Sequence, residues 1–469
     1  MDMTLQQLTV DLKSIGVTCH GDQPSFTTSK RPPNDMLDRW ARAALLADKD
    51  VRAAAGWAIR EAAQHAGIVP SSIQELYIAR ADGKWDNKTV PAMNLRGWTY
   101  QTCRAVFRAA RKLDAHMLIF EQAIGEWQYA EQPPSEFTAG VLAAALREGH
   151  VGPIFLQADH DQINATAFKK DKTAETERLQ RIMREQVAAG FYNIDIDAST
   201  VVDLSLPTVV EQQRLNAEIT AEFTCFIRSI EPKGVTISLG AEIGEVGHHT
   251  TTPEEMRAFM ATYPAAMQER AGKRLIGVSK ISVNSGTYHG GKVLPDGTLA
   301  EVNPDYGTLV AISDICRKEF RMAGVVQHGA STLPGHQLAK FPAAGAIEIH
   351  LALGFNNLIF DHPSLPKDVK AEIRDYVFAN HAKERAPGET DAQFLYNVRK
   401  KSWKIMKRRF TDLPTRTQED IMASLEKMFT DMFGWMNVGK TRDLVTQYTT
   451  VVKVASPAPS EITALLKAA

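Results

Sequence analysis

The chain has 469 residues, of which 44% are hydrophobic and 23% charged. This composition is typical of a globular enzyme, either one large barrel with additions or two to three ordinary domains. Its 54 Lys and Arg against 55 Asp and Glu give a formal charge of −1, which excludes a global field attracting nucleic acid or an anionic membrane.

The cysteines and the first residues indicate the cellular setting. Four cysteines are scattered without a C-x-x-C pair, so neither a disulfide framework nor a cysteine zinc site is expected. Residues 1–7 carry no basic segment followed by an apolar core, and no run of the chain reaches the length of a membrane span. We therefore expect a cytoplasmic protein without nucleic-acid or membrane partners.

The hydrophobic pattern changes character along the chain. Residues 1–88 show short helical patterns at 36–47 and 51–66, which predict an N-terminal helical extension. From residue 89, short apolar runs alternate with long amphipathic segments, a pattern typical of repeated βα units. Eight strands are predicted, at residues 89–93, 116–122, 152–158, 192–196, 235–241, 275–283, 324–327 and 346–350. The predicted helices between them lie at residues 100–113, 134–148, 173–189, 209–230, 252–268, 306–321 and 334–343.

Eight consecutive units favour a closed barrel over an open doubly wound sheet, which is the alternative. The segment 89–362 is close to the roughly 250 residues typical of a (β/α)8 barrel. Beyond it the strand pattern stops, and residues 363–469 predict a C-terminal helical arm that serves as a cover or an oligomer contact. The predicted fold class is α/β, a (β/α)8 TIM barrel with N-terminal and C-terminal helical extensions.

Titratable side chains stand at the ends of four of these strands. Asp159 and His160 follow the third, Glu242 the fifth, His289 the sixth and His328 the seventh. Because the carboxyl ends of parallel strands form the face where ligands bind, we expect these five residues to converge.

Three imidazoles around an open position suit a catalytic Zn²⁺ or a similar divalent ion. We assign His160, His289 and His328 to this ion together with Glu242, with Asp159 beside it as a base. A single strand-end histidine is more often structural or solvated, and 13 histidines will place some there by chance. Three at successive strand ends reverse that interpretation.

Several short motifs occur in a fixed order from about residue 89 to residue 350. They are Val90-Pro91-Ala92-Met93-Asn94, Asp159-His160, Ile196-Asp197-Ala198-Ser199, Ala241-Glu242-Ile243-Gly244-Glu245-Val246-Gly247, His289-Gly290 and His328-Gly329-Ala330-Ser331. In this order they resemble the class II, metal-dependent fructose-bisphosphate aldolases and their ketose-bisphosphate relatives, in a divergent form.

The resemblance implies reversible aldol cleavage of a ketose through a metal-stabilised enediolate. His160, His289 and His328 would hold the metal, and Asp159 would exchange the proton of the hydroxyl whose C–C bond breaks. Asn94 would orient the substrate, and further substrate contacts would come from Asp197, Ser199, Gly290, Gly329 and Ser331. The family is commonly dimeric or larger, so a homodimer or larger homo-oligomer is expected.

Two departures from the family pattern concern proton transfer and phosphate. The acid that the family carries on the loop after its glycine motif is absent, since this loop reads Gly247-His248-His249-Thr250. His248 or His249 could replace it, because an imidazole titrates near neutral pH, or both are exposed loop residues before a helix start.

The family's N-I-D-T ending of the eighth strand reads His350-Leu351-Ala352-Leu353 here, so half of its phosphate cradle is missing. His350, which stands where the family has asparagine, is assigned to substrate binding. A ketose monophosphate or a related sugar is therefore expected. A metal-dependent sugar epimerase on the same scaffold, or a non-catalytic partner subunit of an aldolase, remain alternatives.

Overall fold

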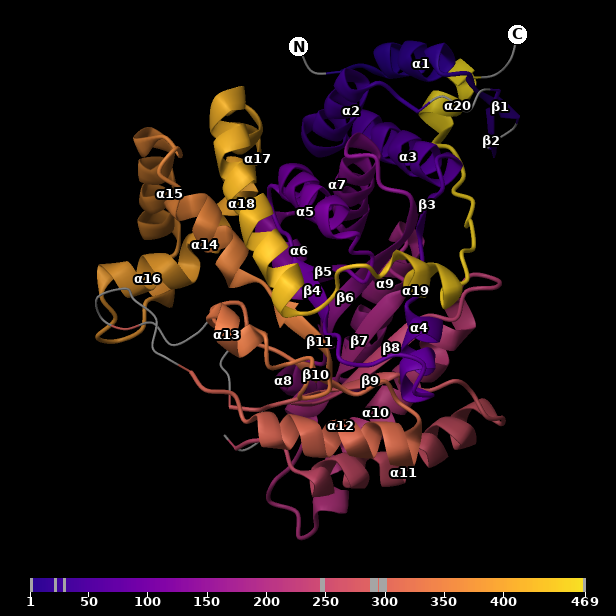
Figure 1. Cartoon of the computed structure of the whole chain (residues 1–469), viewed down its shortest axis with the longest axis vertical. Helices are drawn as coiled ribbons and strands as arrows, with labels where there is room; N and C mark the ends of the chain where they lie inside the picture. Colours follow the sequence, from indigo (N-terminus) through magenta and orange to yellow (C-terminus); the bar gives the residue numbers. More distant parts are fainter. Residues whose placement is uncertain are drawn as a thin grey trace.

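Eight parallel strands close into a barrel in the computed structural model, which describes residues 3–20, 23–27, 31–244, 249–286, 294 and 302–466 (Figure 1). Each strand pairs with the next in chain order, and β11 pairs with β4 to close the circle. The strands are β4 (Val90–Asn94), β5 (Ile119–Ala123), β6 (Gly152–Gln162), β7 (Asn193–Asp197), β8 (Ser238–Gly244), β9 (Lys280–Val283), β10 (Val325–Gln327) and β11 (Ala346–Leu351). The predicted TIM barrel is confirmed.

Strands β8 and β9 begin later than the apolar runs of the sequence predict. Side chains form hydrogen bonds with the backbone groups just before these strands. Arg228 donates to the carbonyls of Ile237 and Ile276, each at 2.8 Å, and the Ile237 N–H donates to Glu231 at 3.0 Å. These groups are satisfied without a neighbouring strand, so the segments enter the barrel as irregular chain.

Strand β6 instead extends past its predicted end at residue 158 and contains a bulge. Its register against β7 shifts between Ala158 and Asp161, and His160 has a positive φ of 49°. A bulge bends the strand and redirects side chains. Asp159 and His160 therefore lie within the strand and not beyond it.

Helices surround the barrel, largely where the sequence predicts them. They are α5 (Thr99–Leu113), α6 (Ile124–Ala130), α7 (Pro134–Arg147), α8 (Ala165–Lys170), α9 (Lys172–Ala189), η1 (Ser199–Val201), α10 (Val209–Ile230), α11 (Pro253–Ala271), α12 (Tyr306–Phe320), α13 (Gly335–Leu338) and α14 (Leu353–Asp361). The short helices α6, α8 and α14 were not predicted. Helix α13 is shorter than the predicted segment 334–343, because the chain continues as turns after Leu338. One of these turns is closed by a hydrogen bond from the Gly345 N–H to the Pro342 carbonyl.

The N-terminal extension covers one end of the molecule. Its elements are α1 (Leu5–Ser14), β1 (Val17–His20), β2 (Gln23–Phe26), α2 (Asn34–Leu46), α3 (Lys49–His65), β3 (Ile68–Pro70) and α4 (Gln74–Ala81). The antiparallel pair β1–β2 and the strand β3, which pairs with the start of β6, were not predicted.

The C-terminal arm is helical, as predicted, and returns to the N-terminal extension. Its elements are α15 (Lys367–Asn380), η2 (Ala382–Glu384), α16 (Asp391–Val398), η3 (Arg399–Ser402), α17 (Trp403–Thr411), α18 (Thr415–Trp435), α19 (Arg442–Gln447) and α20 (Ser460–Leu466). Helix α18 packs on α5, and α20 lies beside α1, so both ends of the chain meet (Figure 1). The division at residues 88 and 362 stays a prediction, since one hydrophobic core runs from Leu8 to Leu466.

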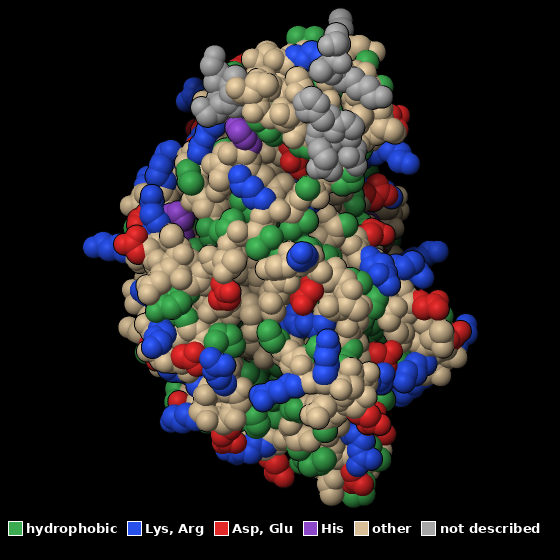
Figure 2. All heavy atoms as spheres, turned by 90° about the vertical axis from the view of Figure 1, so that its right-hand side faces the viewer, with side chains coloured by type: hydrophobic (Ala, Val, Ile, Leu, Met, Phe, Trp, Pro, Cys, Tyr) green, Lys and Arg blue, Asp and Glu red, His purple; other side chains and the backbone are tan. Residues whose placement is uncertain are grey.

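Helix α17 anchors the arm against the barrel. Lys407 donates to Glu136 at 2.8 Å, and the indole of Trp403 lies against Gly97, where a Cβ would come within 2.1 Å of it. Lys, Arg, Asp and Glu are interspersed over the face shown in Figure 2. No helix within the described ranges has the length and apolar character needed to cross a membrane.

Candidate active site

The carboxyl ends of the strands bring together most of the described residues that the sequence singled out. Asn94 ends β4, Asp159 and His160 lie in β6, Glu242 in β8 and His350 in β11, while His328 directly follows β10. Asp159, Glu242, His328 and His350 are buried, and His160 is partly buried. The predicted convergence of Asp159, His160, Glu242 and His328 is thus present in the structure.

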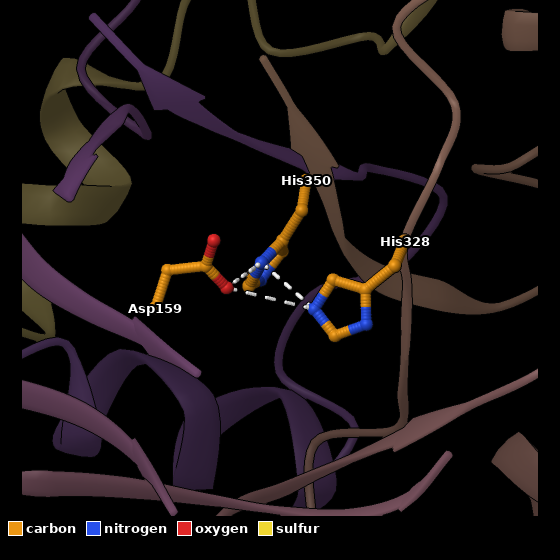
Figure 3. Close-up of side chains that lie close together, drawn as sticks. All are labelled: Asp159, His328 and His350. Atoms are coloured by element: carbon orange, nitrogen blue, oxygen red, sulfur yellow. Dashed lines mark hydrogen bonds and ion pairs between the residues drawn. The ribbon is translucent and has the colours of Figure 1, made fainter. Parts of the chain in front are cut away.

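Asp159 is the centre of this group. Its Oδ1 lies 2.9 Å from Nδ1 of His350, 3.6 Å from Nε2 of His160 and 3.7 Å from Nε2 of His328. Figure 3 shows the carboxylate pointing at the two rings of His328 and His350. Burial alone raises the pKa of Asp159, but His160 and His350 outweigh this effect and hold it well below the usual range. The carboxylate is therefore ionised among imidazoles.

The second oxygen of Asp159 is held from the other side. Asn94 Nδ2 donates to Asp159 Oδ2 and to Glu126 Oε2, each at 3.1 Å. Glu126 in turn pairs with the buried Arg96 at 2.7 Å. This chain of contacts fixes the orientation of the Asp159 carboxylate.

His160 is oriented by two further carboxylates. Its Nδ1 lies 2.9 Å from Glu242 Oε2 and 3.3 Å from Asp197 Oδ2. Burial lowers the pKa of His160, but Glu242 and Asp159 outweigh it and raise the pKa well above its usual value. Ser199 Oγ donates to Asp197 at 2.7 Å, so Asp197 and Ser199, predicted to bind substrate, lie behind His160 and fix its ring.

A buried polar network, absent from the sequence-based prediction, fills the barrel below these groups. Lys280 Nζ donates to Glu348 at 2.5 Å, to Gln157 at 2.8 Å and to Asp195 at 3.0 Å. Burial lowers the pKa of Lys280, but Asp195 and Glu348 raise it above its usual value overall. Each of these charged residues interrupts an apolar strand, as Lys280 does in residues 275–283, and that interruption is the signal that could have revealed them.

The remaining predicted residues divide into two sets. His248, His289 and Gly290 lie outside the described residues. His249 is described, and its Nε2 lies 3.1 Å from Glu255 in the first turn of α11, which holds the ring at that helix start. Gly329 and Ser331 follow β10, and the Ser331 carbonyl lies against Gly354 of α14.

The donors present fit a divalent metal ion. One set of candidate ligand atoms, from His160, Glu242 and His328, lies within 4.8 Å of one another, and the rings of His160 and His328 are 4.1 Å apart. Imidazole and carboxylate donors suit Zn²⁺ and related divalent ions. The residues that the sequence assigned to the metal, as far as they are described, are compatible with that role.

A pocket of about 620 Å³ opens beside His160 and is lined also by Ile124, Gln162 and Arg178. Its size lies within the range of small-molecule sites.

Comparison with known proteins decides the family. The sequence profile described as fructose-bisphosphate aldolase class-II matches residues 80–413. The chain belongs to this family. The resemblance seen in the motifs is therefore confirmed. Members of this family typically depend on a divalent metal ion.

Solved structures of a sugar-acid epimerase show the same fold at low sequence identity. The native fructuronate-tagaturonate epimerase UxaE from Cohnella laeviribosi is 10% identical, with a TM-score of 0.53 over 75% of this chain and 82% of that one. Its complex with one glycerol covers 91% of this chain and 90% of that one, with a TM-score of 0.52 and 10% identity. A fructose-bisphosphate aldolase from Campylobacter jejuni is 17% identical over 80% of this chain and 96% of that one, with a TM-score of 0.46. No curated protein matches this chain.

Proposed function

We propose that this chain is a metal-dependent enzyme of the class II aldolase type, which reversibly breaks the bond between the α carbon of a ketose and its hydroxyl-bearing β carbon. The observation that carries the proposal is the position of the buried Asp159 carboxylate, whose Oδ1 lies within 3.7 Å of three imidazoles. Such a carboxylate can accept a proton in a site that also offers ligands for a cation.

The metal ligands proposed are His160, His328 and, from the sequence, His289, with Glu242 beside them. A bound Zn²⁺, or another divalent ion, would supply a Lewis acid for the carbonyl oxygen of the substrate. Glu242 and Asp197 hold Nδ1 of His160, and an outer contact of this kind fixes the tautomer and orientation of a ligating histidine.

Proton transfer is assigned to Asp159. The carboxylate takes the proton from the substrate hydroxyl, the oxygen becomes an aldehyde as the C–C bond breaks, and the electron pair stays on the carbon next to the ketone. Asn94, which holds Oδ2, keeps Asp159 aimed at that hydroxyl. Completing the cleavage then requires a second proton, delivered to the carbon that carries the electron pair.

The source of that second proton separates cleavage from epimerisation. The loop sequence Gly247-His248-His249-Thr250 contains no acid, and His249 lies against Glu255. An epimerase that rejoins the two fragments needs no proton on carbon, because the electron pair attacks the opposite face of the aldehyde and Asp159 returns its proton to the oxygen. The missing loop acid favours this second candidate.

The proposed substrate carries at most one phosphate. Leu351 and Leu353, at the position of the family's anion-binding ending, are 2% and 7% exposed, so their apolar side chains offer no partner to a dianion. The Gly329–Ser331 turn and Gly290 are the groups proposed to hold an anionic end. Fructose 1,6-bisphosphate should therefore be a poor substrate.

A substrate panel tests the proposal. Zn²⁺-loaded protein is incubated in D₂O with ketohexoses, their monophosphates, hexuronates and fructose 1,6-bisphosphate, and the products are identified by NMR. Cleavage gives a donor fragment with deuterium on carbon, whereas epimerisation by rejoining gives a ketose epimer without it. Turnover of no substrate by metal-loaded protein would refute the proposal and favour a non-catalytic partner subunit.

A further inference from the structure

His350 makes contacts that a substrate-binding side chain does not need. Its Nδ1 lies 2.9 Å from Asp159 Oδ1 and 3.0 Å from Nε2 of His328. His328 Nε2 is itself 3.7 Å from the same carboxylate oxygen. Figure 3 shows the three groups pointing at one another from separate strands and loops. Three candidate metal-ligand atoms thus lie close together inside the barrel.

The other nitrogen of His350 faces away from His328 and Asp159. Nε2 lies 2.6 Å from Glu348 Oε1, and Glu348 also accepts from Lys280. Because Nε2 faces the Glu348 carboxylate, Nδ1 is the nitrogen directed at Asp159 and His328. An imidazole that donates from Nε2 to a carboxylate is oriented to bind a metal ion through Nδ1.

Acidic side chains surround His350 inside the barrel. Four buried carboxyl groups lie around its ring, those of Glu121, Asp159, Asp195 and Glu348. Lys280 donates to Asp195 and Glu348. Carboxylate and imidazole groups are the donors that Zn²⁺ and related divalent ions bind in proteins.

The spacing of the three atoms matches a metal site. A tetrahedral Zn²⁺ with ligands at about 2.0–2.1 Å separates neighbouring ligand atoms by about 3.3 Å. The observed separations of 2.9, 3.0 and 3.7 Å lie on both sides of that value. No rearrangement of the strands is needed to place an ion between these atoms.

We propose that His350 binds a divalent metal ion together with His328 and Asp159, with the ion lying between these three side chains. The inference rests on the metal dependence in the proposed function, and it adds a ligand at a position where the family has asparagine. Glu348 is the positioning residue that fixes the ring, in the carboxylate–histidine–metal arrangement known for metal sites. Asp159 Oδ2, the oxygen contacted by Asn94, stays available for proton transfer.

The test compares metal binding in the wild type and three variants of the full chain. His350→Asn removes the imidazole, Glu348→Gln weakens the outer contact, and His116→Asn is the control, since His116 precedes β5 at the opposite end of the barrel. Chelated protein is equilibrated with buffered Zn²⁺, and Co²⁺ is used for visible spectra. We expect His350→Asn to raise the dissociation constant at least about tenfold and to change the Co²⁺ spectrum, and Glu348→Gln to raise it by roughly 10- to 100-fold. His116→Asn should match the wild type.

Unchanged Zn²⁺ affinity and an unchanged Co²⁺ spectrum in folded His350→Asn would overturn the inference. If this variant does not fold, ¹⁵N spectra of histidine-labelled, Zn²⁺-loaded wild type decide: a proton on both nitrogens of His350 overturns the inference, and a metal shift at its Nδ1 supports it. Binding through His350 without turnover of any ketose would refute only the proposed function. Zn²⁺-dependent turnover with unchanged binding in His350→Asn would refute only this inference.

Discussion

Lys280→Met should destabilise the protein far more than an ordinary lysine substitution. The Lys280 side chain is fully buried, and its ammonium lies 2.9 Å from Asp195 and 2.5 Å from Glu348, which are 8% and 0% exposed. Methionine keeps most of the volume but leaves both carboxylates without their cation. Removing one partner of a buried ion pair costs about 3–5 kcal/mol, so the free energy of unfolding should fall by that amount.

The matched control is Lys318→Met, which breaks an exposed pair with Asp314, with side-chain exposures of 72% and 52%. Its cost should be below about 0.5 kcal/mol. Urea unfolding, followed by both circular dichroism and fluorescence, measures the two variants, and Lys280→Met combined with Glu348→Gln should recover part of the loss. If the loss in free energy of unfolding for Lys280→Met is within about 1 kcal/mol of the loss for the control, Lys280 does not stabilise the two carboxylates as ions, and the reasoning is refuted.

Two further predictions concern residues away from the site. Burial lowers the pKa of His150 from 6.5 to about 3. As the pH falls below 6.5, the unfolded chain binds a proton at this residue before the folded chain does, so the free energy of unfolding decreases. Urea unfolding at pH 7.5 and at pH 5 should therefore show that this decrease is about 2 kcal/mol smaller in His150→Gln than in the wild type. Equal losses would refute this. Gly97→Ala should lower Tm more than Gly83→Ala, because both residues have positive φ (78° and 72°) but only a Cβ at 97 meets Trp403, at 2.1 Å. Equal shifts in Tm would show that Trp403 moves aside at little cost.

The barrel was predictable because its signal is repeated. Eight apolar runs alternate with amphipathic segments, and each helix from α5 to α12 is long enough to show its own periodicity, apart from the short α6 and α8. The first and last residues of the strands were harder to predict from the sequence, because they depend on contacts between residues that are distant in the chain. The late start of β8, for example, follows from the bonds that Arg228 and Glu231 make to Ile237.

The mouth of the barrel was predictable from strand ends, but its interior was not. Asp159, His160 and His328 stand next to strand ends, so their convergence follows from parallel topology alone. The partners of Lys280 depend on strand register, which decides whether a charged side chain faces the barrel axis or the helices. The contact of His350 with Glu348 and Asp159 likewise needs the register of β11 against its neighbours.

Asp159→Asn tests the central claim, that the Asp159 carboxylate transfers a proton in a metal-dependent C–C reaction, most directly. The variant keeps the shape of the side chain and a contact for Asn94 but removes the proton acceptor. Turnover of the best substrate of the panel is measured for the wild type and the variant at saturating Zn²⁺, with metal occupancy determined in the same samples. We predict a loss of turnover by a factor on the order of 10² to 10⁴ at equal occupancy. Turnover within about threefold of the wild type would contradict the assignment of Asp159 as the base, because a positioned acid or base usually contributes a factor on the order of 10² or more to the rate.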